Sequence, residues 1–350
     1  MQITHIPTPS HEEVLRVTDT ATGLVGFIAI HSTALGPAAG GLRMKPYASE
    51  EAALTDALRL SHGMTFKNAA AGLPLGGGKA VILGDPARDK TEAMLAAFAG
   101  AIAALKGRYW TAEDMGMSPE DMAVIARGTE FVVGLADGPF ASGDPSPITA
   151  RGIFNAIRCT ARHRFGSASL SGRKVAVQGL GHVGWDLAAQ LHAAGAALIV
   201  ADIDPARCDA AASRFGAAIA PVDRILGVEA DILAPCAIGG ILNAETIPAL
   251  KVAAVAGGAN NQLATPADGD ALHRRGILYA PDYVANAGGI VNVATEILRI
   301  RDRAGFVKEK LAEAEASLDA ILTRAALRGV SPHKLADEIV LTRMQRRPAA

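Results

Sequence analysis

The feature of this 350-residue chain that most restricts its fold is a regular alternation of short apolar strands and helices from Lys174 onward. The stretch "KVAVQGLGHVGWDLAAQLHAAGA" predicts a strand, a tight turn and a helix, and "LIVADID" predicts the next strand. Three more short apolar stretches follow, each with a small or polar residue at its end: "ADILAPC", "VAAVAGGAN" and "ILYAPDYVAN". Strands that alternate with helices in this way predict an α/β fold with a parallel, doubly wound sheet.

The first half of the chain has a less regular pattern. It predicts strands over residues 24–30 and 79–84, a glycine-rich turn over 36–44, helices from Ser49 to 70 and over 91–106, and a short strand entering a loop over 108–116. The segment "ASGDPSPITARG" (141–152) predicts a link between two domains. There Ser146 is predicted to cap a helix that opens on Pro147 and runs to about Arg164. From about residue 305 the chain is predicted to be helical to its end.

Composition excludes several classes of partner. The net charge is −1, and the lysines and arginines are scattered rather than gathered in the basic stripe of a nucleic-acid-binding protein. Cys159, Cys208 and Cys236 are far apart, which favours a reducing compartment and argues against a disulfide framework or a zinc site, so no metal is predicted. The N-terminus lacks the pattern of a signal peptide, and no apolar run reaches membrane-spanning length. We therefore expect a soluble cytoplasmic protein.

The stretch "VAVQGLGHVG" places Gly179, Gly181 and Gly184 in the GxGxxG spacing between a predicted strand and a predicted helix. In a dinucleotide site the first glycine permits the tight turn, the second lets the backbone approach the pyrophosphate, and the third lets helix and strand pack closely. Asp202 ends the next strand, where a carboxylate binds ribose hydroxyls and repels a 2′-phosphate. The pattern predicts NAD rather than NADP, although Arg207 nearby keeps NADP open. A Rossmann-like domain without a dinucleotide is the alternative.

Three glycines directly precede Lys79 in "LPLGGGKAVI", and an apolar run follows it. A surface side chain is the ordinary interpretation of a lysine, but this setting leaves little solvated surface. A buried lysine near a second cation has a lowered pKa and can act as a general base. Lys67 and Asp114 also lie among small or apolar residues. A P-loop is excluded because no Ser or Thr follows the lysine, and a pyridoxal-phosphate lysine would leave the dinucleotide motif unexplained.

Seven motifs in this order resemble the leucine, phenylalanine and valine dehydrogenase branch of the amino acid dehydrogenase family, which is related to glutamate dehydrogenase. They cover the chain from about residue 20 to 345: "GPAAGGLRM", "GMTFKNAAAGLPLGGGKAVILGDP", "GRYWTAEDMG", "VAVQGLGHVG", "APCAIGG", "GGANNQLATP" and "LYAPDYVANAGGIVNVATE". The resemblance implies NAD-dependent, reversible oxidative deamination of an L-amino acid to a 2-oxo acid and ammonia. It also implies a homo-oligomer, from dimer to octamer.

The resemblance further implies two domains with a cleft between them. Residues 1–145, with the C-terminal helices at about 320–350, would form a mixed-sheet domain for substrate binding and oligomerisation, and residues 146–319 the Rossmann-like domain that binds NAD. In the first domain Lys67 would bind the substrate carboxylate, Lys79 would activate water as the general base, and Asp114 would relay protons. Gly40 and Gly41 would let the backbone approach the substrate. The nicotinamide end of NAD would contact Thr149, Asn260, Asn261 and Asn286.

Substrate choice follows from the residues implied to line the side-chain pocket: Ala39, Ala112, Ile290 and Val293. The glutamate enzymes of this family have a lysine and a serine at the positions of Ala39 and Val293, so a glutamate side chain would be buried here without a partner. Leucine and other branched-chain substrates are therefore predicted. A phenylalanine- or tryptophan-preferring relative is the main alternative. A non-catalytic NAD-binding regulator and a hydroxy acid dehydrogenase are others; the first is opposed by the Lys67, Lys79 and Asp114 set.

Overall fold

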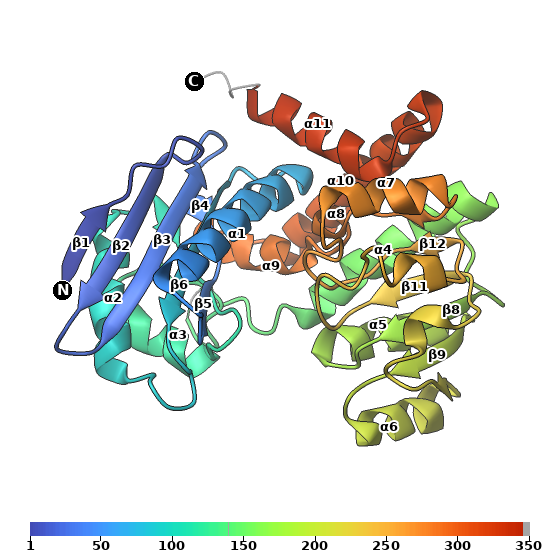
Figure 1. Cartoon of the computed structure of the whole chain (residues 1–350), viewed down its shortest axis with the longest axis horizontal. Coiled ribbons are helices and arrows are strands. Elements are labelled where there is room, and N and C mark those ends of the chain that lie inside the picture. The colour runs from blue at the N-terminus through green and yellow to red at the C-terminus, as the bar shows by residue number, and fades with distance from the viewer. Residues whose placement is uncertain (139, 346–350) are drawn as a thin grey trace. The chain divides into compact units, whose positions relative to one another are not determined.

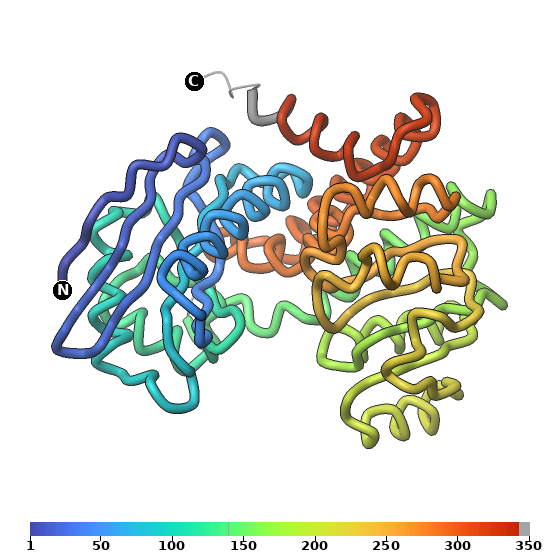
Figure 2. Tube along the Cα trace, in the orientation of Figure 1, coloured from blue at the N-terminus to red at the C-terminus, as the bar shows by residue number. Residues whose placement is uncertain are grey.

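The computed structural model describes residues 1–138 and 140–345, which fall into two compact units (Figures 1 and 2). Unit 1 comprises Met1–Asp144, Asn292–Phe306 and the described residues from Arg343 onward, and unit 2 comprises Pro145–Val291 and Val307–Thr342. No helix in these described residues is both long and apolar enough to cross a membrane.

Unit 1 is built on a mixed seven-stranded sheet of order β1-β2-β3-β6-β4-β7, with β5 paired to β6. Neighbours from β1 to β6 are antiparallel, while β4 and β5 run parallel to β6. The strands are β1 (Gln2–His5), β2 (Glu13–Asp19), β3 (Leu24–Ser32), β4 (Ala38–Ala39), β5 (Leu42–Lys45), β6 (Gly76–Leu83) and β7 (Tyr109–Trp110). The helices of this part are α1 (Glu50–Ala70), α2 (Glu92–Ala104) and α3 (Pro119–Ala126).

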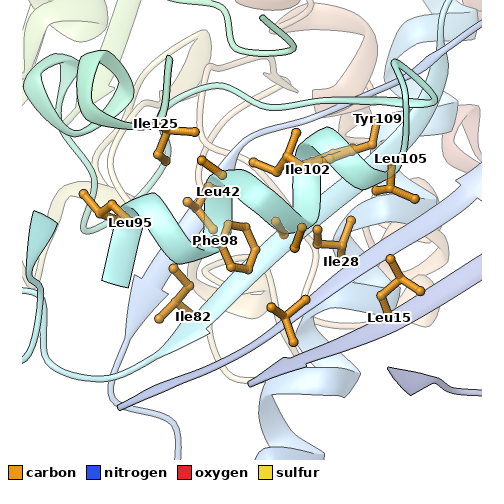
Figure 3. Packing of buried hydrophobic residues seen from close by; sticks show 14 of the residues in the cluster. Leu15, Ile28, Leu42, Ile82, Leu95, Phe98, Ile102, Leu105, Tyr109 and Ile125 are labelled. Atoms are coloured by element: carbon orange, nitrogen blue, oxygen red, sulfur yellow. The ribbon is translucent and has the colours of Figure 1, made fainter. Parts of the chain in front are cut away.

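The two-residue period of β3 explains how this sheet holds a helix on each face. Phe27 and Ala29 belong to a buried cluster with Ala53 and Ala57 of α1. Ile28 and its neighbours on the opposite face belong to a second cluster with Phe98 and Ile102 of α2 and Ile125 of α3 (Figure 3). Because successive side chains of a strand point to opposite faces, a nearly continuous apolar strand serves both clusters.

In the first half one local prediction is corrected by the structure and another is confirmed. The predicted turn over 36–44 contains the short strands β4 and β5, whose apolar side chains Ala38, Leu42 and Met44 are buried in the second cluster. The long helix that precedes β6 begins as predicted, since the Ser49 hydroxyl accepts a hydrogen bond from the Ala52 amide at 3.2 Å.

Unit 2 contains a six-stranded, wholly parallel sheet of order β10-β9-β8-β11-β12-β13. This is the strand order of a doubly wound Rossmann sheet, so the predicted fold class is confirmed. The strands are β8 (Lys174–Gln178), β9 (Ala197–Ala201), β10 (Ala218–Ile219), β11 (Ile232–Pro235), β12 (Ala254–Val255) and β13 (Leu278–Tyr279). The helices that connect or cover them are α4 (Ser146–Phe165), α5 (His182–Ala193), α6 (Pro205–Phe215), α7 (Pro266–Arg274) and α8 (Asp282–Ala285).

The start of α4 differs from the prediction. Ser146 is the first residue of the helix rather than its cap, and the capping position belongs to Pro145. The amide and the hydroxyl of Thr149 both donate to the Pro145 carbonyl oxygen at 2.9 Å, so the backbone turns into the helix one residue earlier than the proline rule suggested.

The C-terminal helices are α9 (Gly288–Ile297), α10 (Arg303–Arg328) and α11 (Pro332–Gln345). Their division between the units differs from the predicted one, in which residues 320–350 join the first domain. Most of α10 and α11 belongs to unit 2, because Asp319 of α10 pairs with His163 of α4 and Lys334 of α11 pairs with Asp270 of α7. Residues 346–350 of the predicted helical segment lie outside the described residues.

Candidate active site

Close backbone packing explains the three glycines before Lys79. A Cβ atom on Gly76 would lie 2.0 Å from the Ser32 carbonyl oxygen, and one on Gly77 would lie 2.1 Å from the Thr65 amide nitrogen. On Gly78 it would lie 2.6 Å from the Tyr109 ring. The triplet thus lets β3, α1 and β7 approach the start of β6. Lys79 is the first residue of β6 after the triplet to carry a side chain, and it is only 5% exposed.

The Lys79 side chain meets a carboxylate. Its Nζ forms a hydrogen-bonded ion pair with Oδ2 of Asp114. Nη2 of Arg43 lies 3.3 Å from the same oxygen, and Nη1 of Arg43 lies 3.1 Å from Oδ2 of Asp56. Burial acts to raise the pKa of Asp114, but the charges of Lys79 and Arg43 outweigh it and lower that pKa to about 2. Asp114 is therefore a carboxylate anion shared by two cations.

Arg43 is a site residue that sequence reasoning missed. It stands in "GPAAGGLRM", which was interpreted as a turn, but the structure makes it part of β5. There Leu42 and Met44 are buried, so Arg43 points to the opposite face of the strand. This alternation was the available signal. The second cation expected near Lys79 is thus present, but a carboxylate lies between the two positive groups.

The paired glycines Gly40 and Gly41 also have a structural explanation. A Cβ on Gly40 would lie 1.9 Å from the Gly78 carbonyl oxygen, and one on Gly41 would lie 2.7 Å from the carbonyl oxygen of Glu113, beside Asp114. The Tyr109 hydroxyl donates to the Gly40 carbonyl at 2.6 Å. Both glycines therefore let the strand that carries Lys79 and the loop that carries Asp114 lie close together.

The other predicted substrate residues are distributed as follows. Lys67 lies in the last turn of α1, partly exposed, on the helix that packs against β6. Ala39 is only 1% exposed, between Gly77 and Trp110 in the sheet. Three more residues were assigned to the pocket. Ala112 is partly exposed in unit 1, Val293 is buried in the part of α9 that belongs to unit 1, and Ile290 is buried in the part that belongs to unit 2. Their pocket-lining role stays a prediction.

The glycine turn of unit 2 lies between β8 and α5. Gly179 has a φ of 94°, a conformation that glycine adopts without strain. A Cβ on Gly184 would lie 1.9 Å from the Gly179 carbonyl oxygen, whereas one on Gly181 would meet no atom within 4 Å. No side chain of the described chain caps the first turn of α5, which leaves its amides to bind an anion. The turn therefore fits a pyrophosphate that approaches at Gly181.

Asp202 follows β9 and lies beside this turn. Its Oδ2 accepts a hydrogen bond from the Leu180 amide at 2.6 Å, and its Oδ1 accepts one from the Asp204 amide at 2.9 Å. Each carboxylate oxygen keeps a further lone pair for a ribose hydroxyl. Arg207 pairs with Asp204 at 3.4 Å.

Asparagines form a second polar group in unit 2. Asn286 is 2% exposed, and its Nδ2 donates to Oδ1 of Asn260 at 2.9 Å and to the Gly258 carbonyl at 3.2 Å. The buried Oδ1 of Asn286 has no hydrogen-bond partner among residues 1–138 and 140–345. Asn261 adopts a left-handed backbone with a φ of 52°. An acceptor left open in this way fits a carboxamide or hydroxyl donor of a dinucleotide.

Thr149 was predicted to contact the nicotinamide. Its hydroxyl is used at the start of α4, where it donates to the Pro145 carbonyl. A Cβ on Gly289 would lie 2.9 Å from this hydroxyl oxygen, so Thr149 lies against the first turn of α9. The oxygen keeps its acceptor capacity, and its role toward a cofactor stays a prediction.

Models of one protein family match both halves of the chain. Residues 11–131 match the Glu/Leu/Phe/Val dehydrogenase dimerisation domain, and residues 208–343 match the Glutamate/Leucine/Phenylalanine/Valine dehydrogenase domain. The chain belongs to the Glu/Leu/Phe/Val dehydrogenase family. The resemblance found in the sequence is confirmed. This Glu/Leu/Phe/Val dehydrogenase is thus an amino acid dehydrogenase, an oxidoreductase that uses a nicotinamide dinucleotide.

Individual relatives agree with this assignment. The chain is 53% identical to a leucine dehydrogenase of Geobacillus stearothermophilus, over 84% of this chain and 80% of the relative. It is 45% identical to a phenylalanine dehydrogenase of Caldalkalibacillus thermarum, over 96% of this chain and 92% of the relative. The crystal structure of an L-tryptophan dehydrogenase from Nostoc punctiforme superposes with a TM-score of 0.84 at 41% identity, covering 97% of both chains.

Proposed function

We propose that this Glu/Leu/Phe/Val dehydrogenase catalyses the reversible, NAD-dependent oxidative deamination of apolar L-amino acids, with leucine and other branched-chain substrates preferred. The observation that carries the proposal is the buried ion pair of Lys79 and Asp114, held by Arg43. A lysine and an aspartate that share a hydrogen bond can exchange a proton with a bound substrate or water.

Unit 1 supplies the proposed substrate-binding residues, and unit 2 supplies the proposed dinucleotide-binding residues. The proposed reaction therefore needs residues of both units. A nicotinamide dinucleotide held by unit 2 would supply the acceptor for the hydride of the amino acid Cα, which would leave an imino acid. Lys67 binds the substrate carboxylate with its ammonium group and fixes the orientation of Cα. Asp114 relays the protons of the amino group without retaining them, because its low pKa keeps it ionised between transfers. As an anion it stabilises a positively charged substrate nitrogen.

Hydrolysis of the imino acid requires an activated water. Lys79 removes a proton from that water, which attacks the imine carbon, and the resulting carbinolamine releases ammonia. Lys79 acts as a base after its ammonium group has released a proton to solvent, and its hydrogen bond to Asp114 holds Nζ in position. Since Lys79 is nearly buried, the water that it activates is shielded from bulk solvent, which strengthens the electrostatic interactions of the site.

The preference for NAD rests on Asp202. Its carboxylate is oriented by two backbone amides, and a 2′-phosphate of NADP would bring a second negative charge against it. Arg207, the residue that could have compensated, is paired with Asp204. Gly179, Gly181 and Gly184 are proposed to hold the pyrophosphate, and Asn260, Asn261, Asn286 and Thr149 the nicotinamide end.

The preference for a branched aliphatic side chain rests on Ala39 and Val293, which replace the polar pair implied for glutamate enzymes, and on the leucine dehydrogenases among the relatives. A preference for phenylalanine or tryptophan is the second candidate, supported by relatives of those names. One methylene changes binding by only about 1–3 kcal/mol, so overlapping substrates are expected. A homo-oligomer is also proposed, because residues 11–131 match a dimerisation domain.

A substrate panel at fixed NAD tests this proposal. NADH absorbance is followed with leucine, valine, phenylalanine, tryptophan, glutamate and lactate, and the panel is repeated with NADP. We expect the highest kcat/KM with leucine and none with glutamate or lactate. A higher kcat/KM with phenylalanine or tryptophan would establish the second candidate, and turnover of lactate without turnover of any amino acid would contradict the proposed deamination.

A further inference from the structure

A group of three potential metal ligands lies in unit 2, among residues that have no part in the proposed reaction. Cys159 and His163 are four residues apart on α4, so they lie on one face of that helix. Asp319 approaches them from α10. One ligand atom of each residue, the thiol sulfur, an imidazole nitrogen and a carboxylate oxygen, lies within 4.8 Å of the other two.

These separations are near those of a bound ion. Around tetrahedral zinc the ligand atoms lie about 3–4 Å apart, given metal–ligand bonds of about 2.0–2.3 Å. Nε2 of His163 is already 2.7 Å from Oδ1 of Asp319. Small side-chain rotations are therefore enough to bring the three atoms onto one centre. Thiolate, imidazole and carboxylate together form a donor set that suits zinc rather than magnesium or calcium.

A positively charged group already lies between two of these atoms. Nη2 of Arg162 is 2.8 Å from Oδ1 of Asp319 and 3.8 Å from Sγ of Cys159. The arginine side chain is 47% exposed, so its head can turn into solvent when another cation takes its place. The structure thus contains a cation position between sulfur and oxygen, filled here by a guanidinium.

The charges around this position favour a cation. Hydrogen bonds from His163 and then Arg162 lower the pKa of Asp319, which keeps it anionic. Glu315 lies one turn earlier on α10 and interacts electrostatically with both Cys159 and Arg162. His163 and Asp319 are 20% and 44% exposed, so an ion can enter from their side.

We propose that Cys159, His163 and Asp319 bind a divalent transition metal of the zinc type. The Arg162 head leaves, and a water molecule or Glu315 completes a tetrahedral set. Burial raises the pKa of the free Cys159 thiol to about 12, so the ion itself must displace the thiol proton, which passes to solvent. The bound ion ties α4 to α10 within unit 2. This site is independent of the proposed deamination.

Cobalt(II) is the probe, because a thiolate ligand gives it a charge-transfer absorption band that histidine and carboxylate ligands do not. The full-length protein is freed of metal and titrated with Co²⁺. We expect a thiolate band that saturates at one equivalent and is displaced by Zn²⁺. The band should be absent in Cys159→Ser and Cys159→Ala, and retained in the matched control Cys208→Ser, which alters another buried cysteine of unit 2.

Further variants separate metal binding from a structural role. His163→Ala and Asp319→Asn should weaken Co²⁺ binding at least about tenfold. Even residues that only hydrogen-bond to a metal ligand usually contribute that much to metal affinity. Arg162→Ala should bind Co²⁺ more tightly than the wild type, although it loses an ion pair. Each variant is compared with its own metal-free thermal unfolding curve, so a general loss of stability is recognised. A wild type without a thiolate band, a band that persists without Cys159, or an Arg162→Ala variant that binds no more tightly would each overturn the proposal.

Discussion

Two groups of glycines serve different purposes in this dehydrogenase. At each glycine of the triplet before Lys79, the position that a Cβ atom would occupy lies against other protein atoms. A methyl group there would collide with Ser32, Thr65 or Tyr109. In the turn between β8 and α5, Gly184 is similarly enclosed, but Gly181 faces open space. A glycine whose Cβ position is filled by other protein atoms indicates close packing. A glycine whose Cβ position is open, at a helix N-terminus without a side-chain cap, indicates room for a ligand. The comparison separates a region packed closely around Lys79 from one that has room for the proposed cofactor.

The largest effect is expected from Lys79→Ala. Loss of a general base lowers kcat by roughly 10²–10⁴-fold, while the dinucleotide residues of unit 2 are untouched. Steady-state kinetics with leucine and a fluorescence titration with NADH measure the two effects separately. Lys90→Ala is the control, because it removes a second lysine of unit 1 that pairs with an aspartate, at a partly exposed position. Equal losses in the two variants would contradict the assigned role.

The next effect is on stability. In Gly77→Ala the added methyl would lie 2.1 Å from the Thr65 amide nitrogen, a backbone atom that cannot move aside alone. Overpacking of this kind lowers the free energy of unfolding by about 3 kcal/mol. Gly63→Ala is the matched control on α1, where a Cβ meets no atom within 4 Å and alanine should add up to about 1 kcal/mol of stability. Urea unfolding measures the free energy of unfolding of both variants. A loss in Gly77→Ala alone is due to the collision, because Gly63→Ala also replaces a glycine by alanine.

A smaller and purely functional effect is expected from Gly181→Ala. The protein itself leaves space for the methyl, so the unfolding temperature should not change. The methyl would occupy the space through which the pyrophosphate approaches, and NADH should bind about tenfold more weakly, or about 1.4 kcal/mol. Gly227→Ala of the same unit, with its nearest contact at an ordinary 3.7 Å, should bind NADH normally. A fall in stability with unchanged affinity would reverse the assignment of this turn.

The smallest effect concerns pH. Lys79 and Arg43 overcome burial and hold the folded-state pKa of Asp114 at about 2, below its ordinary value of 3.8. A carboxyl group whose pKa is lowered by folding stabilises the folded state at pH values above its ordinary pKa. That contribution to the free energy of unfolding disappears as the pH falls from about 4 towards 2. The stability difference between wild type and Asp114→Asn should therefore shrink over this window. Chemical unfolding at several pH values measures it, and a constant difference would mean that Asp114 does not titrate there.

The proposed metal group and the Arg43 contact show where sequence reasoning ended. Cys159 and His163 have a helical spacing, but Asp319 comes from a distant helix, so scattered cysteines suggested no metal. Arg43 was hidden in a motif interpreted as a turn, because the alternation in β5 covers only four residues.

The sequence by itself determined the family and the alternating α/β half with its glycine turn, and it singled out Lys79, Asp114 and Asp202 as candidate functional groups. Each rests on local spacing or on ordered motifs, which a chain carries before it folds. The tertiary structure decided that the triplet serves backbone packing, that Arg43 shares Asp114 with Lys79, and that α10 packs on α4. These facts depend on contacts between residues far apart in the chain, and a linear pattern contains no distance between them.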